Sequence, residues 1–431
     1  MNEPIVITAT EAICASGTSV AQIHRELLAG HTAFTPLSQW DSSAWPVPLA
    51  GGVPNIDGAG LFDDRRLLKS IQRLRRTDLL GLYAAARAVA NSGIPACSAA
   101  LDESARIQFN ERTAVYTGCG GVGYYYQYDF LPALAAADGD LRRFADKLGA
   151  TVNPTWLLQS LPNNVLCYLG IAFGFKGANT CITNHGTGGA QAIVEAYYAL
   201  RAGEADRALA AGHDCPIEPE IILNLYRLGL LTTDAIRPFD AASSGLIVGE
   251  GAAAMVLETR SAAAARGARV RGEVLGAGFS TEAAGVLSTG ASGDGMAAAI
   301  ELALGEAGVA PAEIALIVAH GNGTAASDRS EAAAIRRVFG RDMPVVTSFK
   351  WAFGDTIAAA GAIDAALALE CLHAETVPGI ATLRQPDPGC AELNLSASPT
   401  RLRGNLALVL SRGFGVMNCA LVIKAPRDGH S

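Results

Sequence analysis

Residues 183–193 read TNHGTGGAQAI. An apolar run over 179–183 leads into this stretch, glycines occupy its centre, and an Ala-rich segment follows over 190–201. The same alternation recurs upstream at the β-branched run 114–116 and downstream at the apolar run 207–212. Short apolar strands that alternate with helical segments predict an α/β protein with largely buried strands.

Two segments of the chain resemble each other. Residues 249–258 read GEGAAAMVLE, and residues 413–424 read GFGVMNCALVIK, so each is a glycine turn followed by an apolar strand. This repeat predicts two similar α/β halves, residues 1–258 and residues 259–431, with the junction within 259–271. Alternatively, both segments are merely glycine-opened core strands in one large sheet.

The composition is that of a well-packed globular protein, with 431 residues, 50% hydrophobic and 17% charged. A net charge of −8 argues against a nucleic-acid partner or an anionic membrane surface, since both require basic residues. The 9 cysteines include no C-x-x-C pair, so the sequence signals neither a zinc site nor a disulfide framework. We expect no metal and no cofactor.

The location predicted from the sequence is the cytoplasm. The first residues run directly into a strand and lack the basic start and apolar stretch of an export signal. The longest apolar segment, 356–372, contains Asp364 and Glu370, so it is too charged and too short to span a bilayer. We expect it to form a buried helix.

Four glycine-rich strings together resemble the β-ketoacyl synthases of the thiolase superfamily, over about Val6 to Lys424. They are GFKGAN at 174–179, RPFD at 237–240 followed by Gly245 and GEG at 249–251, HGNGT at 320–324 with Asp328 and Glu331, and residues 350–361. The resemblance implies the five-layered α-β-α-β-α fold built of two pseudo-repeated halves, in agreement with the repeat.

The resemblance also implies a site. In that family a cysteine at a strand-to-helix turn accepts the acyl chain, and two histidines polarise the malonyl thioester carbonyl, while a lysine and a glutamate support them. The matching positions here are Gly186 for the cysteine, His320 and Asp355 for the histidines, and Lys350 and Glu331 for the supporting pair. Two of the three reacting groups are replaced, so no residue is predicted to catalyse condensation.

Asp355 replaces a hydrogen-bond donor with a group that is normally an anion at neutral pH. An anion would repel the enolate that the histidines stabilise. We expect Asp355 to form a structural ion pair with Lys350 or to bond with His320; a raised pKa that keeps it protonated is the alternative.

Glu331 also has an explanation without chemistry. Asp328-x-x-Glu331 precedes an Ala-rich segment and matches a capping box of a helix that Gly340 ends.

No other residue is expected to have taken over as nucleophile. Cys181 lies on the apolar strand before the turn, where we expect its thiol to be buried and uncharged. Thr187 and His185 flank Gly186, but adjacent residues that leave a strand tend to point in different directions.

Two details are similar to the chain-length factors, the inactive partners of ketosynthases in type II polyketide synthases. They are Gly188-Gly189 after the vacated position, and Arg412 where condensing members usually carry a phenylalanine that gates the acyl pocket. Chain-length factors of aromatic pathways typically carry glutamine at the vacancy and lack the His320 equivalent. The departures favour a partner for a reducing, polyene-making ketosynthase.

An aromatic cluster is the predicted tunnel wall. The glycine-rich run 118–123 is followed by Tyr124 and Tyr125, in the region that lines the family's acyl tunnel near the dimer interface. These tyrosines, with Arg412 and Phe414, are the candidate gating residues. Alternatively, the tyrosines belong to the core.

The leading hypothesis is a pseudoenzyme that pairs with an active ketosynthase as a heterodimer, shapes its acyl tunnel and sets product length, while an acyl carrier protein docks on the complex. The rival is a stand-alone homodimeric acyltransferase or hydrolase that uses His320 as general base. A degenerate synthase with only a scaffold role is the third reading.

Overall fold

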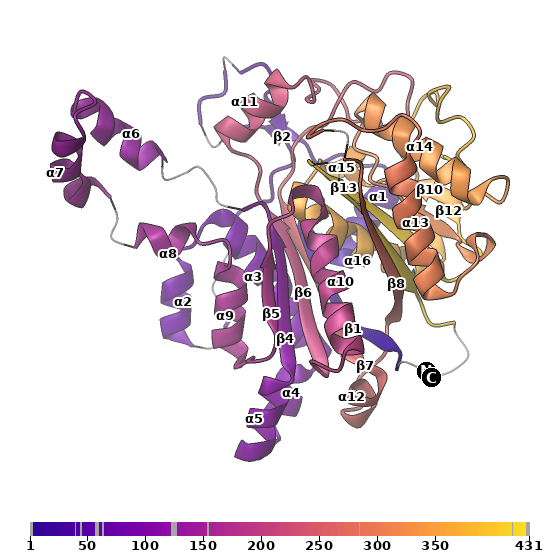
Figure 1. The fold of residues 1–431 in the computed structure, drawn as a ribbon, viewed down its shortest axis with the longest axis horizontal. Helices are drawn as coiled ribbons and strands as arrows, with labels where there is room; N and C mark the ends of the chain where they lie inside the picture. The colour runs from indigo at the N-terminus through magenta and orange to yellow at the C-terminus, as the bar shows by residue number, and fades with distance from the viewer. Residues whose placement is uncertain are drawn as a thin grey trace.

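The structure is a computed structural model. It describes residues 3–38, 40–43, 45–56, 60–62, 64–121, 127–152, 155–283, 285–415 and 417–427. Within these ranges a 10-stranded sheet runs in the order β10-β9-β13-β14-β8-β1-β7-β6-β4-β5 (Figure 1).

The sheet divides into two halves of five strands each. The first half contains β1 (Ile5–Cys14), β4 (Thr113–Cys119), β5 (Asn179–Ile182), β6 (Arg207–Asp214) and β7 (Gly251–Thr259). The second contains β8 (Gly272–Thr281), β9 (Leu316–Val318), β10 (Val345–Thr347), β13 (Leu406–Gly413) and β14 (Met417–Lys424). Two short ribbons lie outside it, β2 (Thr35–Pro36) with β3 (Leu49–Ala50), and β11 (Thr376–Val377) with β12 (Thr400–Arg401).

The two halves repeat one topology. Across the sheet the strand orders are β5-β4-β6-β7-β1 and β10-β9-β13-β14-β8. In both halves the first strand of the chain lies at one end of this order and the third strand at the other, with the second, fourth and fifth between them in the same positions. In both halves the first two pairings are parallel and the last two are antiparallel. The segments that look alike in sequence lie on β7 and β14, the equivalent fifth strands. The repeat is therefore confirmed, and the two segments also belong to one 10-stranded sheet, as the alternative supposed. The boundary between residues 258 and 259 stays a prediction.

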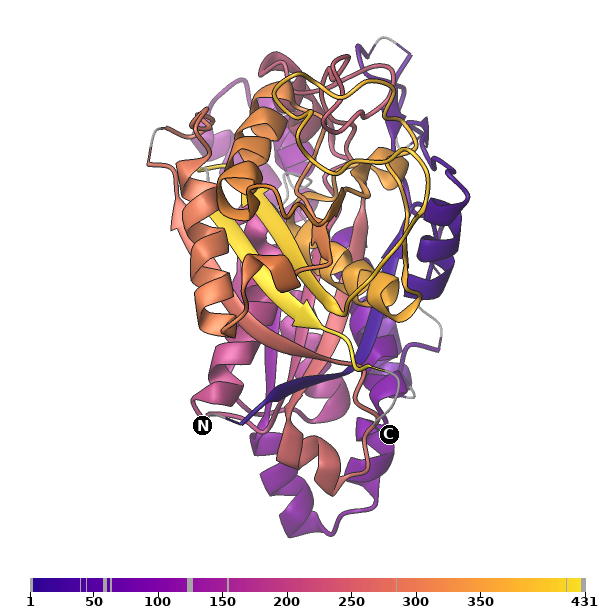
Figure 2. The ribbon, with the colours of Figure 1, turned by 90° about the vertical axis from the view of Figure 1, so that its right-hand side faces the viewer.

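The halves meet along a short seam. Strand β1 pairs with β7 over its whole length but with β8 only at three residues, Ile5, Val6 and Ile7. Beyond them the two sheets diverge, and two helices fill the space between, α10 (Gly188–Arg201) and α16 (Ala360–His373), which contact each other and strands of both sheets (Figures 1 and 2).

Helices also cover the outer faces and complete five layers. Against the first sheet pack α3 (Arg76–Ser92) and α9 (Asn164–Phe173). Against the second packs α13 (Asp294–Ala307), with α14 (Ala325–Phe339) beside it. The predicted α-β-α-β-α architecture is confirmed.

The apolar composition of helix α16 explains why this helix lies in the central layer, between the two sheets. All its residues are buried except Glu370 and His373. A helix that is apolar around its whole circumference belongs in an interior. The predicted buried helix in 356–372 is thus confirmed, with its first turn formed by a short 3₁₀ segment.

The remaining helices lie at the edges of these layers. They are α1 (Val20–Leu28), α2 (Arg65–Ile71), α4 (Ile94–Ala99), α5 (Glu103–Glu111), α6 (Gln127–Ala136), α7 (Leu141–Thr151), α8 (Trp156–Ser160), α11 (Pro219–Arg227), α12 (Arg260–Ala265) and α15 (Lys350–Phe353), with 3₁₀ turns η1 (His185–Thr187), η2 (Pro311–Glu313) and η3 (Ile357–Ala359). Within the described ranges, none is long and apolar enough to cross a membrane.

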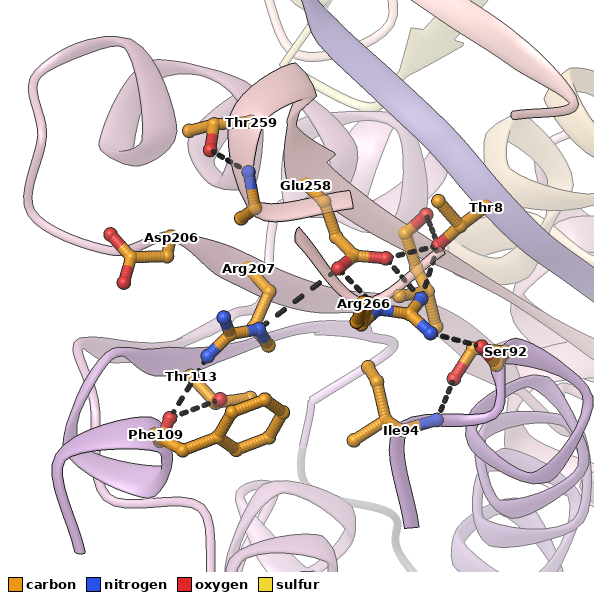
Figure 3. A network of polar contacts seen from close by, with 12 residues as sticks. Thr8, Ser92, Ile94, Phe109, Thr113, Asp206, Arg207, Glu258, Thr259 and Arg266 are labelled. Carbon is orange, nitrogen blue, oxygen red and sulfur yellow. Dashed lines mark hydrogen bonds and ion pairs between the residues drawn. The ribbon is translucent and has the colours of Figure 1, made fainter. Parts of the chain in front are cut away.

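A buried polar network holds the point where the chain passes from the first half to the second (Figure 3). The carboxylate of Glu258, near the end of β7, is fully buried and accepts hydrogen bonds from Thr8 Oγ1 at 2.6 Å and from Arg266 Nε at 2.7 Å. Arg266 also donates to the Ser92 carbonyl at 2.6 Å, and Arg207 lies 4.0 Å from the carboxylate. The network joins β1, β6, β7 and α3 to the segment after α12.

Replacing Arg266 with methionine is expected to destabilise the protein by about 3 kcal/mol or more, because Glu258 would lose its closest cation while it stays buried. The control is Arg337→Met, which breaks an exposed pair with Asp294 (2.7 Å) and is expected to cost at most about 1 kcal/mol. Denaturant unfolding measures both. Equal losses in the two variants would show that the network does not stabilise the junction.

Candidate functional site

The candidate site forms where the two halves of the fold present equivalent turns. After β5 the chain enters η1 and then α10, and after β10 it passes through α15 into η3 and then α16. The turns η1 and η3 contact each other. Each opens on a non-glycine residue with left-handed backbone, His185 (φ 47°) and Ile357 (φ 47°). Such strain persists only where the surrounding structure enforces it.

A cavity of about 130 Å³ opens between these turns. Five of the predicted site residues line it, namely Gly186, His320, Asp355, Arg412 and Phe414. Apolar side chains form most of the remaining wall, including Leu225, Leu230, Leu246, Val286, Leu287 and Ile357. The residues that the sequence separated by more than half the chain therefore share one site.

Gly186 is closed off by the backbone of a neighbouring strand. A Cβ atom built on Gly186 would lie 2.3 Å from the carbonyl oxygen of Arg412 and 3.2 Å from the Cα of Gly413. Real Cβ atoms essentially never come within 3.0 Å of another heavy atom. The vacated position therefore lacks a nucleophile, and any side chain there would require the backbone at the end of β13 to shift.

The neighbouring Gly189 is also a packing residue. A Cβ there would lie 2.6 Å from the carbonyl oxygen of Ala358, which lies in η3, the turn that leads into α16. Gly189 thus allows α10 to approach the equivalent turn of the other half, whereas a Cβ on Gly188 would make only ordinary contacts, none closer than 3.6 Å.

His320 is positioned through its backbone. The carboxylate of Glu331 accepts from the His320 N–H at 2.7 Å and from the Gly321 N–H at 2.9 Å. The imidazole lines the cavity and makes no hydrogen bond to any part of the chain that the structure describes. Burial, reinforced by the cations Lys350 and Arg412, holds the pKa of His320 well below its usual value, so the ring is neutral.

The predicted capping box is wrong. Helix α14 has Thr324 as its N-cap, so Asp328 and Glu331 lie inside the helix and are buried. Asp328 accepts a hydrogen bond from the Phe239 N–H at 2.9 Å, and Glu331 accepts one from the His320 N–H. The helix does end at Gly340, whose φ is 57°. The spacing matched a common motif, but the actual N-cap, Thr324, lies four residues before Asp328.

Lys350 is paired, although not with the predicted partner. Its Nζ lies 3.0 Å from Asp364 Oδ2, and both side chains are almost completely buried. Asp355 instead accepts from the Ile357 N–H at 3.0 Å and from Asn322 Nδ2 at 3.4 Å. The expected pairing of Asp355 with Lys350 or His320 is therefore wrong, because α16 places a closer carboxylate beside the lysine. The signal for this pair was Asp364, the one charged residue among the apolar residues 360–369 of the helix.

Arg412 is fixed by hydrogen bonds. Its guanidinium donates to Asn418 Oδ1 at 2.9 Å, to the Ser327 carbonyl oxygen at 3.2 Å and to Glu282 Oε1 at 3.3 Å. These contacts hold the end of β13 against β14, α14 and the residue that follows β8, and they fix the carbonyl that closes Gly186. A gating role for Arg412 stays a prediction.

His185 and Phe414 form a wall between two cavities. Their ring centroids lie 4.4 Å apart at an interplanar angle of 32°. Together with Leu225 and Ile357 they line both the first cavity and a second one of about 320 Å³. The second cavity is also lined by Arg75, Thr77, Cys119, Gly120, Gly121, Asp214, Cys215, Pro216, Glu218, Ile221, Asn224 and Leu228.

His185 and Thr187 do not form the nucleophile–base pair considered above, because each side chain is engaged elsewhere. The Thr187 hydroxyl donates to the Asn184 carbonyl at 2.9 Å and is buried, so it is engaged with the backbone. Burial lowers the pKa of His185, which leaves a second neutral imidazole facing the first cavity. Sequence reasoning missed this wall role, because only the stacking with the distant Phe414 reveals it.

The expected burial of Cys181 is wrong, and the predicted tyrosine wall is not described by the structure. Cys181 is half-buried rather than buried, because β5 is the edge strand of the sheet and its first two residues are exposed. Tyr124 and Tyr125 lie outside the described residues. Within the described ranges no group of three or more His, Cys, Asp or Glu residues is placed to hold a metal ion.

The comparisons with known proteins agree with this fold and site. Residues 2–263 match the model of the beta-ketoacyl synthase N-terminal domain, and residues 271–384 match that of the C-terminal domain. The chain therefore belongs to the β-ketoacyl synthase family.

Its similarity to individual relatives extends over nearly the whole chain. It is 29% identical to nodulation protein E of Rhizobium leguminosarum bv. trifolii, covering 96% of this chain and 97% of that protein. It is 27% identical to 3-oxoacyl-[acyl-carrier-protein] synthase 2 of Staphylococcus aureus (strain COL), covering 98% of each. Among solved structures, the ishigamide ketosynthase/chain length factor matches with a TM-score of 0.86 and 28% identity over 99% of this chain and 100% of that one. The relatives thus include named synthases as well as a ketosynthase/chain length factor.

The contribution of Asp328 to stability is expected to fall as the pH rises from about 4 to about 7. Burial raises the pKa of Asp328 to about 7, and its Oδ1 atom has no hydrogen-bond partner among the described residues. An unfolded chain releases this proton near pH 4. Between the two values the folded state holds the extra proton, so the free energy of unfolding decreases with pH, by up to about 1.4 kcal/mol per unit for this group.

The measurement is unfolding free energy against pH for the native chain and for Asp328→Asn. Relative to the native chain, the free energy of unfolding of the variant is expected to rise with pH over this window, because the decrease due to Asp328 is absent. Asp214, whose pKa burial also raises to about 7, is unchanged in both proteins and contributes equally. Parallel curves would show that Asp328 is ionised in the folded state.

Proposed function

We propose that this protein is a non-condensing, chain-length-factor-like subunit that pairs with an active ketosynthase. The observation that carries the proposal is the 2.3 Å approach of the Arg412 carbonyl oxygen to the missing Cβ of Gly186. A covalent acyl intermediate needs a side-chain nucleophile at the strand-to-helix turn. A position that is closed to every side chain has no condensing role.

The second reacting position supports the same proposal. Both oxygens of the Asp355 carboxylate accept hydrogen bonds, one from the Ile357 N–H and one from Asn322. A carboxylate held in this way donates no hydrogen bond to a developing enolate, which is the task of the second histidine in a condensing site.

Surfaces at the edge of the first half suit a partner subunit. Among the described residues, strand β5 pairs only with β4, so its outer edge is open, and its residues Asn179 and Thr180 are exposed. An open strand edge is a template for pairing with another chain. Helices α6 and α7 project from the body and pack on each other (Figure 1), and they expose Leu131 (52%) and Leu141 (72%). We propose that the ketosynthase covers both features in a heterodimer.

The proposed contribution to product length is geometric. The wall of His185 and Phe414 separates the cavities of about 130 and 320 Å³. An acyl chain that extends from the partner into either cavity would stop at this aromatic wall, because the two packed rings leave no space for further carbon atoms. The growing chain would be presented by an acyl carrier protein of a type II polyketide pathway, and the retained His320 favours a polyene-making one.

One observation favours a rival function. The His320 imidazole is neutral, free of hydrogen bonds to the described residues and open to the cavity, as a general base for hydrolysis or acyl transfer would be. That function predicts turnover of acyl thioesters by the protein alone, abolished in His320→Gln. An absence of turnover by the native chain separates the proposed function from this rival.

Replacing Gly186 with cysteine is expected to leave condensing activity absent and to destabilise the fold by about 1–3 kcal/mol, because the new Cβ displaces the end of β13. The matched control is Gly305→Ala on α13, where an added Cβ meets nothing within 4 Å and stability is expected to hold or rise. Thioester condensation assays and denaturant unfolding check both variants. A stable, condensing cysteine variant would refute the closure of the site.

Co-expression with a type II ketosynthase tests the proposed function itself. Native mass measurement is expected to give a one-to-one complex, and Phe414→Ala is expected to lengthen the product because it joins the two cavities. The control, Leu302→Ala, alters an exposed side chain on α13 and should leave the length unchanged. If the complex assembles but Phe414→Ala leaves the product length unchanged, the proposed role of the aromatic wall is wrong. If the chain forms a homodimer and no complex with the ketosynthase, the proposed function is wrong.

A further inference from the structure

A polar cavity of about 410 Å³ lies where the two sheets begin to diverge. It is bounded by β1 beyond its short pairing with β8, by the start of α1, by the ends of α3 and α16, and by the segment before β8. It shares no lining residue with the two cavities of the candidate site. The proposed function therefore makes no use of it.

The charges that line this cavity are balanced. They come from two arginines, Arg269 and Arg271, and from two glutamates, Glu11 and Glu370. A site for phosphate or another anion has an excess of cations, whereas a balanced lining suits a ligand that carries both signs.

Glu11 has an unused hydrogen-bond acceptor in the wall of the cavity. The residue is 8% exposed, and its Oε1 atom accepts a hydrogen bond from Asn91 Nδ2 at 2.5 Å. Its Oε2 atom has no hydrogen-bond partner among the described residues. Burial raises the pKa of Glu11 against the opposing effect of Arg87 and Arg271. A buried acceptor without a donor costs free energy, which an N–H group of a ligand would recover.

Arg271 has the opposite need. Its backbone is fixed on both sides, because its N–H donates to the Ile7 carbonyl oxygen and its carbonyl oxygen accepts from His373 Nε2, both at 2.7 Å. Its Nε atom has no hydrogen-bond partner among the described residues. Its guanidinium lies 3.6 Å from the Glu370 carboxylate, which is longer than a hydrogen bond. The side chain therefore retains donors for a carboxylate.

We propose that this cavity binds a small zwitterion of the amino-acid class, whose ammonium group donates to Glu11 and whose carboxylate accepts from Arg271. The two side chains line one cavity, and the structure shows no ion pair between them. A molecule with both charges satisfies the free acceptor and the free donor together, whereas a simple anion or cation satisfies one of them.

The proposed heterodimer leaves this cavity accessible. Strand β1 is separated from the edge strand β5 by β7, β6 and β4, and no residue of α6 or α7 lines the cavity. Ala21 and Arg269 are exposed at its rim. A small solute can therefore enter with or without the partner subunit, and the inference does not depend on the proposed function.

The experiment titrates the purified full-length chain by isothermal titration calorimetry with two zwitterions, L-glutamine and 4-aminobutanoate, whose charged groups are separated by different distances. Two matched probes carry one charge each. They are 4-carbamoylbutanoate, which is L-glutamine without the ammonium group, and 4-aminobutanamide, which is L-glutamine without the carboxylate. At least one zwitterion is expected to bind at a single site, and each singly charged probe to bind roughly tenfold more weakly or not at all, because it loses one charge-assisted hydrogen bond.

Glu11→Gln and Arg271→Gln are each expected to weaken binding of that zwitterion roughly tenfold or more. Arg106→Gln, which changes an exposed arginine on α5, is the matched control and is expected to bind as the native chain does. The proposal is wrong if neither zwitterion binds, if inorganic phosphate or a singly charged probe binds as tightly as the better zwitterion, or if both cavity variants bind as the native chain does. Should a variant fail to fold, the series of probes on the native chain still decides.

Discussion

The contact on which the site depends is the approach of the Arg412 carbonyl oxygen to Gly186. It joins the last long strand pair of the second half to the strand-to-helix turn of the first, where only a residue without Cβ fits. Arg412 is held in place by its own buried hydrogen bonds to Asn418, Ser327 and Glu282. A change at Gly186 would therefore disturb a network that extends into three elements of the other half.

Behind this closed position, the framework of a condensing site persists. Glu331 still orients the backbone of His320, and Lys350 is still a buried cation, paired with Asp364. Buried charges that lose a partner cost several kcal/mol, so such pairs remain for stability even where they serve no reaction. In the proposed function, this framework holds His320 at the wall of the cavity.

The sequence predicted the fold and the positions of the altered groups because these rest on local patterns. Glycine turns before apolar strands marked the repeat, and the strings around Gly186, His320 and Asp355 marked the cavity. The errors arose where distant parts of the chain decide the contact. The partner of Lys350 depends on how α16 packs between the sheets, and the exposure of Cys181 depends on which strand ends the sheet. Neither the closure of Gly186 nor the stacking of His185 on Phe414 has a local signal.

The most direct test of the division of labour between this chain and a catalytic partner is to find which chain carries the acyl group. The co-expressed complex is incubated with acyl-loaded carrier protein, and the intact mass of each subunit is then measured under denaturing conditions. The account predicts an acyl adduct on the ketosynthase alone, lost when its nucleophilic cysteine is replaced. An acyl adduct on this chain would contradict it.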